Sequence, residues 1–93
     1  MIVDKKDLGI ALKFQIAPVY DIDAYFQELI VDLERNDLVI TGHESARQFI
    51  GVVRKRTAGE DVSLFQRNMV EAWLNNAPEV EWNAVSPVQP FPI

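Results

Sequence analysis

The segment LGIALKFQI, residues 8–16, decides the fold. Its apolar side chains occupy every second position: Leu8, Ile10, Leu12, Phe14 and Ile16. A period of two places successive side chains on opposite faces of a β-strand. We therefore predict a strand with one buried face, which leaves Ala11, Lys13 and Gln15 on the other face. Pro18 is expected to stop the strand, because proline has no N–H for a ladder.

Two amphipathic helices are predicted after this strand. The first covers residues 22–35 and carries an apolar stripe of Ile22, Tyr25, Phe26, Leu29, Ile30 and Leu33. Asp21 stands where a carboxylate accepts hydrogen bonds from first-turn N–H groups. The second covers residues 62–75 with a stripe of Val62, Phe65, Met69, Val70, Trp73 and Leu74. Asp61 or Ser63 is its expected cap, and Ser63 with Gln66 has capping-box spacing.

Three further strands complete the predicted order. Residues 38–42 are rich in β-branched side chains and favour a short strand. Residues 46–54 fit either a helix or a strand; we favour a strand, with residues 42–45 as the hairpin connection. Residues 80–85 alternate and predict a final strand that buries Trp82.

The order of elements predicts an α+β architecture. It reads βαββαβ, the ferredoxin-like split βαβ arrangement, with a four-stranded antiparallel sheet and two helices on one face. We expect a single domain over residues 1–93, with residues 1–6 as an N-terminal extension. Residues 87–93 form a tail that is too rich in proline for a central strand or a helix.

Composition narrows the classes of function. The chain has no cysteine, which excludes disulfides and thiolate metal sites. The charged start lacks the apolar run of a secretory signal, and no stretch approaches the ~20 apolar residues of a membrane span, so we expect a cytoplasmic protein with no membrane partner. The net charge of −5 argues against indiscriminate binding to nucleic acid.

Several short motifs, taken in order, resemble one known family. Residues 8–10 (LGI), 36–42 (NDLVITG), 71–74 (EAWL) and 78–80 (PEV) are similar in sequence and spacing to segments of the YggL family of 50S ribosome-binding proteins. The resemblance covers residues 7–90 and implies association with the large ribosomal subunit. Two features depart from that family: its basic N-terminal arm is reduced here to Lys5 and Lys6, and its Trp-rich chain end is replaced by the segment around Phe91.

The best candidate for a partner-binding surface is basic. It consists of Arg47, Arg54, Lys55, Arg56 and Arg67. Such a cluster grips phosphates, since guanidinium groups bind them in bidentate fashion. The alternative is a solvated strand end and turn that balances acidic neighbours.

The remaining candidates favour structural interpretations. An acidic first helix, with Asp23, Glu28, Asp32 and Glu34, is either an ordinary solvated face or a contact for a basic ribosomal protein. His43, the only histidine, is interpreted as a turn residue, and Asp21 with Asp23 as capping groups. We predict no catalytic residue, metal site, cofactor or small-molecule substrate.

These observations favour a non-enzymatic module that binds the large ribosomal subunit, through either rRNA or a ribosomal protein. The alternative is a small protein-interaction or inhibitor domain, of the kind encoded by phages and mobile elements, that binds a host protein. Small size, negative charge and the reduced basic arm motivate this alternative.

Overall fold

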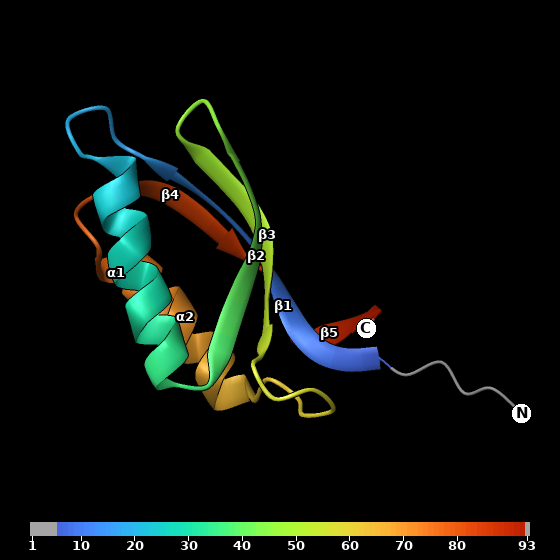
Figure 1. The fold of residues 1–93 in the computed structure, drawn as a ribbon. Helices are drawn as coiled ribbons and strands as arrows, with labels where there is room; N and C mark the ends of the chain where they lie inside the picture. Colours follow the sequence, from blue (N-terminus) through green and yellow to red (C-terminus); the bar gives the residue numbers. More distant parts are fainter. Residues whose placement is uncertain (1–5, 93) are drawn as a thin grey trace, which may run out of the picture.

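The alternating first segment lies at the centre of an antiparallel sheet (Figure 1). The computed structural model describes residues 6–92. The elements are β1 (Lys6–Ile16), α1 (Ile22–Arg35), β2 (Leu38–Ser45), β3 (Gln48–Lys55), α2 (Leu64–Asn76), β4 (Val80–Val85) and β5 (Gln89–Pro92). The α+β class is confirmed. The expected four strands and βαββαβ order are wrong, because a fifth strand follows β4.

The sheet is open, and every pair of neighbouring strands is antiparallel. Four strands lie in the order β2-β3-β1-β4, and β5 pairs separately with the N-terminal part of β1. The register sets Leu12 opposite Gly51 of β3 and Val85 of β4. A register shift between Gln15 and Ile16 interrupts the pairing of β1 with β4.

The core lies between the sheet and the two helices, which Figure 1 shows on the same face of the sheet. Ile10, Leu12, Phe14 and Ile16 of β1 are buried as predicted, whereas Leu8 is only half-buried, and Phe14 is wholly inaccessible to solvent. Its ring packs edge-on against Tyr25 of α1, with 5.8 Å between centroids, and stacks on Phe49 of β3 at 5.5 Å. These aromatic contacts join α1 to the two central strands.

The helix boundaries follow from their caps. α1 has the predicted bounds, and the Asp21 carboxylate accepts hydrogen bonds from the N–H groups of Asp23 (2.9 Å) and Ala24 (3.3 Å). α2 begins two residues later than predicted, because Ser63 and Gln66 form a reciprocal capping box. Val62 is therefore buried ahead of the helix, and Phe65 is 77% exposed rather than part of the buried stripe.

Most of residues 46–54 lie in a strand, as favoured, since β3 covers Gln48–Lys55, but the predicted hairpin connection is wrong. β2 continues to Ser45, and only Ala46 and Arg47 connect it to β3. Both residues have positive φ, at 51° and 66°. This is the conformation that a two-residue hairpin turn demands and that Asn-Gly usually supplies.

The chain ends also differ from expectation. Lys6 begins β1 instead of belonging to an extension, and residues 1–5 of the predicted extension lie outside the described residues. Within the predicted tail, β5 pairs Phe91 with Asp7 and Gln89 with Gly9. Proline is compatible with this strand because β5 pairs on one side only, so that a missing N–H can face away from the ladder.

Candidate partner-binding surfaces

Arg47 lies in the turn between β2 and β3, and its side chain binds this turn to the segment that follows β1. Its Nε donates to the carbonyl of Ile16 (3.2 Å), and its Nη2 donates to the carbonyls of Ala17 (2.9 Å) and Tyr20. Most of the donor capacity of this guanidinium is therefore used within the chain.

Arg67 is also engaged within the fold. It makes a bidentate pair with Glu71 one turn along α2, at 2.8 and 3.0 Å. Its Nη2 and Nε also donate to the carbonyls of Val85 (2.8 Å) and Ser86 (3.1 Å), where β4 ends. Only 17% of the side chain is exposed, so Arg67 fastens α2 to the sheet.

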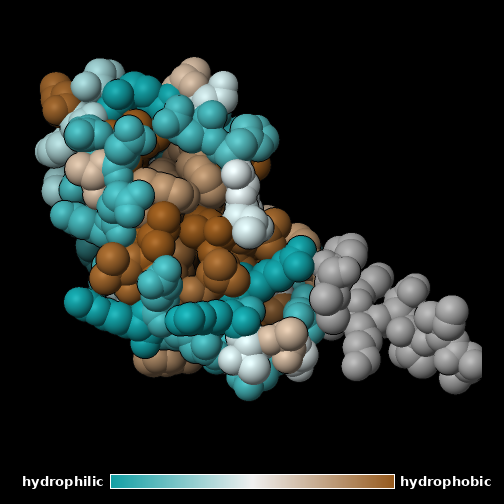
Figure 2. All heavy atoms as spheres, viewed as in Figure 1, coloured by the Kyte–Doolittle hydropathy of each residue, from teal (hydrophilic) through white to brown (hydrophobic). Residues whose placement is uncertain are grey.

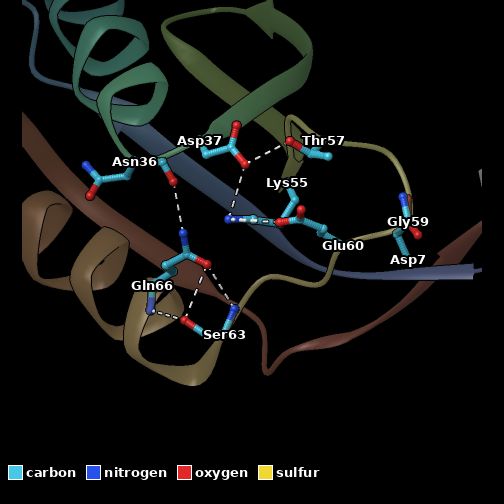
Figure 3. A network of polar contacts seen from close by, with 9 residues as sticks. All are labelled: Asp7, Asn36, Asp37, Lys55, Thr57, Gly59, Glu60, Ser63 and Gln66. Carbon is cyan, nitrogen blue, oxygen red and sulfur yellow. Dashed lines mark hydrogen bonds and ion pairs between the residues drawn. The ribbon is translucent and has the colours of Figure 1, made fainter.

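Lys55 lies in the polar network of Figure 3, where the end of β3 meets the chain after α1. Its ammonium group approaches the carboxylates of Asp37 (3.3 Å) and Glu60 (3.6 Å). Thr57 donates to the same Asp37 oxygen at 3.1 Å. Gln66 closes the network by donating to the carbonyl of Asn36 at 2.9 Å.

Arg54 and Arg56 make fewer side-chain contacts within the described chain. Arg56 is exposed, and its backbone N–H donates to the carbonyl of Asp37. Arg54 is half-buried beside Gly9 and Phe91, and its Nε is buried without a hydrogen-bond partner. The structure therefore brings Arg54, Lys55 and Arg56 together at one end of β3. Arg47 lies at the opposite end of that strand, and Arg67 lies on α2.

The face of the sheet that neither helix covers carries apolar side chains. Val39, Ile50 and Trp82 are 42%, 45% and 38% exposed on it. Trp82 was expected in the core, but its register partner is Gln15, which places it on the uncovered face. The Trp82 indole N–H donates to the Gln15 side chain (3.2 Å), and the Lys13 ammonium group lies 5.5 Å from the ring centroid. We call this surface the open sheet face: Ala11, Lys13, Gln15, Val39, Thr41, His43, Ile50, Val52, Arg54, Trp82 and Ala84.

The open sheet face is hollowed and differs in charge from the whole chain. A shallow pocket of about 350 Å³ lies between Lys13, Ile50 and Ala84. Lys13 and Arg54 give the face two positive formal charges, whereas the chain carries −5, and the Glu81 carboxylate at its rim accepts a hydrogen bond from the Gln15 amide at 3.5 Å. In the sequence, the alternation of residues around Lys13 predicted an exposed face for β1. Residues 80–85 also alternate, but their pattern does not show which of the two alternating sets of side chains faces the helices.

The edge of the sheet at β2 is a second exposed feature. Within the described residues, β2 pairs with β3 alone. Figure 2 shows hydrophobic side chains at the surface between α1 and β2. A pocket of about 190 Å³ lies there, lined in part by Ile22, Phe26 and Phe49 and by the carboxylate-bearing residues Asp23 and Glu44. An unprotected edge beside an apolar groove is the kind of surface to which another strand adds.

The other polar candidates take structural places. His43 lies in β2 rather than in the predicted turn. Asp21 caps α1, as predicted. Residues 6–92 contain no group of three or more histidine, aspartate or glutamate side chains with the geometry of a metal site. No helix in the described part of the chain is long and apolar enough to cross a membrane.

Comparison with known proteins identifies no relative of this chain. No protein-family model, curated protein or solved structure matches the chain.

Proposed function

We propose that this protein is a non-enzymatic, cytoplasmic binding module that docks on the large ribosomal subunit through its open sheet face. The observation that carries the proposal is the composition of that face. It exposes three large apolar side chains and carries Lys13 and Arg54, with the Glu81 carboxylate at its rim, on a chain whose net charge is −5.

Exposed apolar surface of this kind supports a docking role. Single exposed apolar residues are ordinary, but Ile50 lines a hollow together with Ala11 and Ala84, and contiguous apolar surface of this kind marks interaction sites. Trp82 offers a flat ring for stacking, and Lys13 and Arg54 offer charge for phosphates. A face with aromatic and cationic groups suits the rRNA of a ribosomal subunit, and its apolar floor suits a ribosomal protein.

The choice of the large subunit depends on the resemblance to the YggL family, carried by residues 8–10, 36–42, 71–74 and 78–80. The strand path β2-β3-β1-β4, with both helices on one face, supports a ferredoxin-like scaffold to which β5 has been added. We also infer that Arg54 and Arg56 are the members of the basic candidate set that contact the partner. The other three members of the set hold neighbouring segments of the fold in place instead of contacting the partner: Arg47, Lys55 and Arg67.

Sedimentation of tagged protein with purified 50S particles at moderate salt tests the proposal. The full chain is expected in the 50S fractions, and Ile50→Glu is expected to remove most of it, because a carboxylate at the centre of the open sheet face opposes both apolar contact and phosphate. Val19→Glu is the matched control, since Val19 is 85% exposed in the turn after β1. Absence of the full chain from those fractions, or equal loss in both variants, would refute the proposal.

A second function is favoured by the free edge of β2: binding a host protein by strand addition. The two-residue turn pairs Ser45 with Gln48, so the backbone N–H groups of Ile40, Gly42 and Glu44 are directed away from β3. Affinity capture followed by mass spectrometry tests this function. One stoichiometric, non-ribosomal partner that is lost in Glu44→Pro supports it, and recovery of ribosomal proteins alone opposes it.

A further inference from the structure

A separate pocket of about 280 Å³ lies between the two helices, on the side of the sheet opposite the open sheet face. Tyr25, Glu28 and Asp32 line it from α1, and Trp73 lines it from the last turns of α2. Glu79, just before β4, closes one end. Leu29, Ala72, Asn76 and Ala77 form the rest of the wall.

The charge of this pocket is of one sign. Glu28, Asp32 and Glu79 line it, and no lysine or arginine does. Asp32 makes a loose pair with Arg35 at 3.8 Å, in which both side chains are largely hydrated. Within residues 6–92, Glu28 and Glu79 take part in none of the ion pairs. Such a site favours a cation from outside the chain.

Tyr25 supplies an independent sign of a missing ligand. Only 7% of the residue is exposed, yet none of the hydrogen bonds among the described residues involves its hydroxyl. A phenol in so buried a residue usually finds a partner, whereas this hydroxyl is not sealed in the core and opens to the pocket. The hydroxyl lies in the field of the pocket carboxylates: burial raises the pKa of Tyr25, and the charges of Glu79, Asp32 and Glu28 raise it further.

The end of α2 adds to the same preference. The last turn of this helix contains no basic residue, so the partial negative charge of its terminal carbonyls is not balanced from within the helix. These carbonyls lie beside Trp73, which lines the pocket and is half-buried. A cation held there meets an aromatic surface as well as carboxylates.

We propose that this pocket binds an arginine side chain from a basic polypeptide segment. A planar guanidinium stacks on an indole and donates to several oxygens at once, which a compact ammonium group does less well. The segment is polypeptide rather than a free amine, because the hollow continues beyond the pocket along α1, where Gln27, Glu28, Val31 and Asp32 line a second, shallow pocket of about 400 Å³. Further residues of the same segment would occupy this second pocket. The proposal is independent of the open sheet face, which lies on the other side of the sheet.

Titration of the full chain with a capped peptide, acetyl-GSRGSRGS-amide, tests the proposal by calorimetry and NMR. The indole N–H resonance of Trp73, distinguished from that of Trp82 with a Trp82→Phe variant, is expected to shift on binding. Glu79→Gln and Tyr25→Phe are expected to weaken binding about fivefold to tenfold, the scale of one lost charge-assisted contact. Glu34→Gln, which removes the same charge from α1 outside the pocket, is expected to change it by less than about twofold.

Three outcomes would overturn the proposal. The first is equal weakening by Glu79→Gln and Glu34→Gln, which would mean that only net charge matters. The second is undiminished binding of a peptide with citrulline in place of arginine. The third is displacement of the peptide by spermine at concentrations below that of the peptide, which would identify a free polyamine as the occupant. Because none of these readouts involves ribosomes, failure here is distinguishable from failure of the proposed docking function.

Discussion

Arg67 provides the sharpest test of the structural role assigned to a basic candidate. In Arg67→Lys the charge remains, but the fork that reaches Glu71 and the carbonyls of Val85 and Ser86 together is lost. At least two of these acceptors lose their partner. A hydrogen bond to a charged group contributes about 1.5–3 kcal/mol, and the partial exposure of Glu71, 37%, lowers the value for that pair. We expect a loss of ~2–3 kcal/mol in the free energy of unfolding.

Urea unfolding monitored by circular dichroism measures this loss. With an m-value of about 1 kcal/mol per molar urea for a chain of this size, the midpoint is expected to fall by about 2–3 M. Arg56→Lys, at an exposed position, is the control and is expected to change the free energy by less than ~0.5 kcal/mol. A double-mutant cycle with Glu71→Gln separates the ion pair from the carbonyl contacts. A loss below ~1 kcal/mol in Arg67→Lys would refute the reasoning, because the carbonyl contacts would then contribute almost nothing.

The remaining predictions concern the core, a cap and a titrating group. Phe14→Ala is expected to lower the free energy of unfolding in urea by ~3–5 kcal/mol, because loss of the wholly buried ring leaves a cavity between α1 and β3. Phe65→Ala, at a 77% exposed position, is the control and is expected to lower it by less than ~0.5 kcal/mol. Similar losses in the two variants would contradict the assigned core. Ser63→Ala removes the capping box and is expected to lower the free energy of unfolding by about 1 kcal/mol. The NMR chemical shifts of the first turn of α2 are expected to become less helical in this variant. The raised pKa of Tyr25 means that the unfolded chain ionises first, so the stability due to neutral Tyr25 is complete below its ordinary value of 10.0 and falls as the pH rises above it. Unfolding titrations across this range should show a steeper alkaline decline for the wild type than for Tyr25→Phe, and parallel declines would count against the buried hydroxyl.

The spacing of apolar residues along the sequence predicted the elements that bury one regular face. The alternation in residues 8–16 identified β1, and the apolar stripe with Asp21 gave the bounds of α1, because both signals come from the residues that form the element. The hairpin turn was misplaced because Ala46 and Arg47 adopt positive φ without the Asn-Gly signature. That conformation is imposed by the pairing of β2 with β3, which lies outside the turn itself.

The candidate sites were harder to predict, because their geometry depends on contacts between distant segments. Nothing near Arg47 in the sequence reveals that the carbonyls of Ile16 and Ala17 receive its guanidinium. Trp82 was expected in the core, since the alternation in β4 fits either face until the register with β1 is known. β5 was missed because its prolines oppose strand formation locally, and only pairing with β1 overrides them.

The many partners of β1 have a kinetic consequence. This strand is translated before the other described strands, but β4 and β5, which pair with its two halves, are translated after all the others of this sheet. Closing such large loops costs chain entropy before any contact compensates for it, so we expect α1 and the β2–β3 hairpin to form early and the completed sheet to appear slowly. Until then β1 would expose an apolar row, which makes the nascent chain more vulnerable to aggregation than the finished protein.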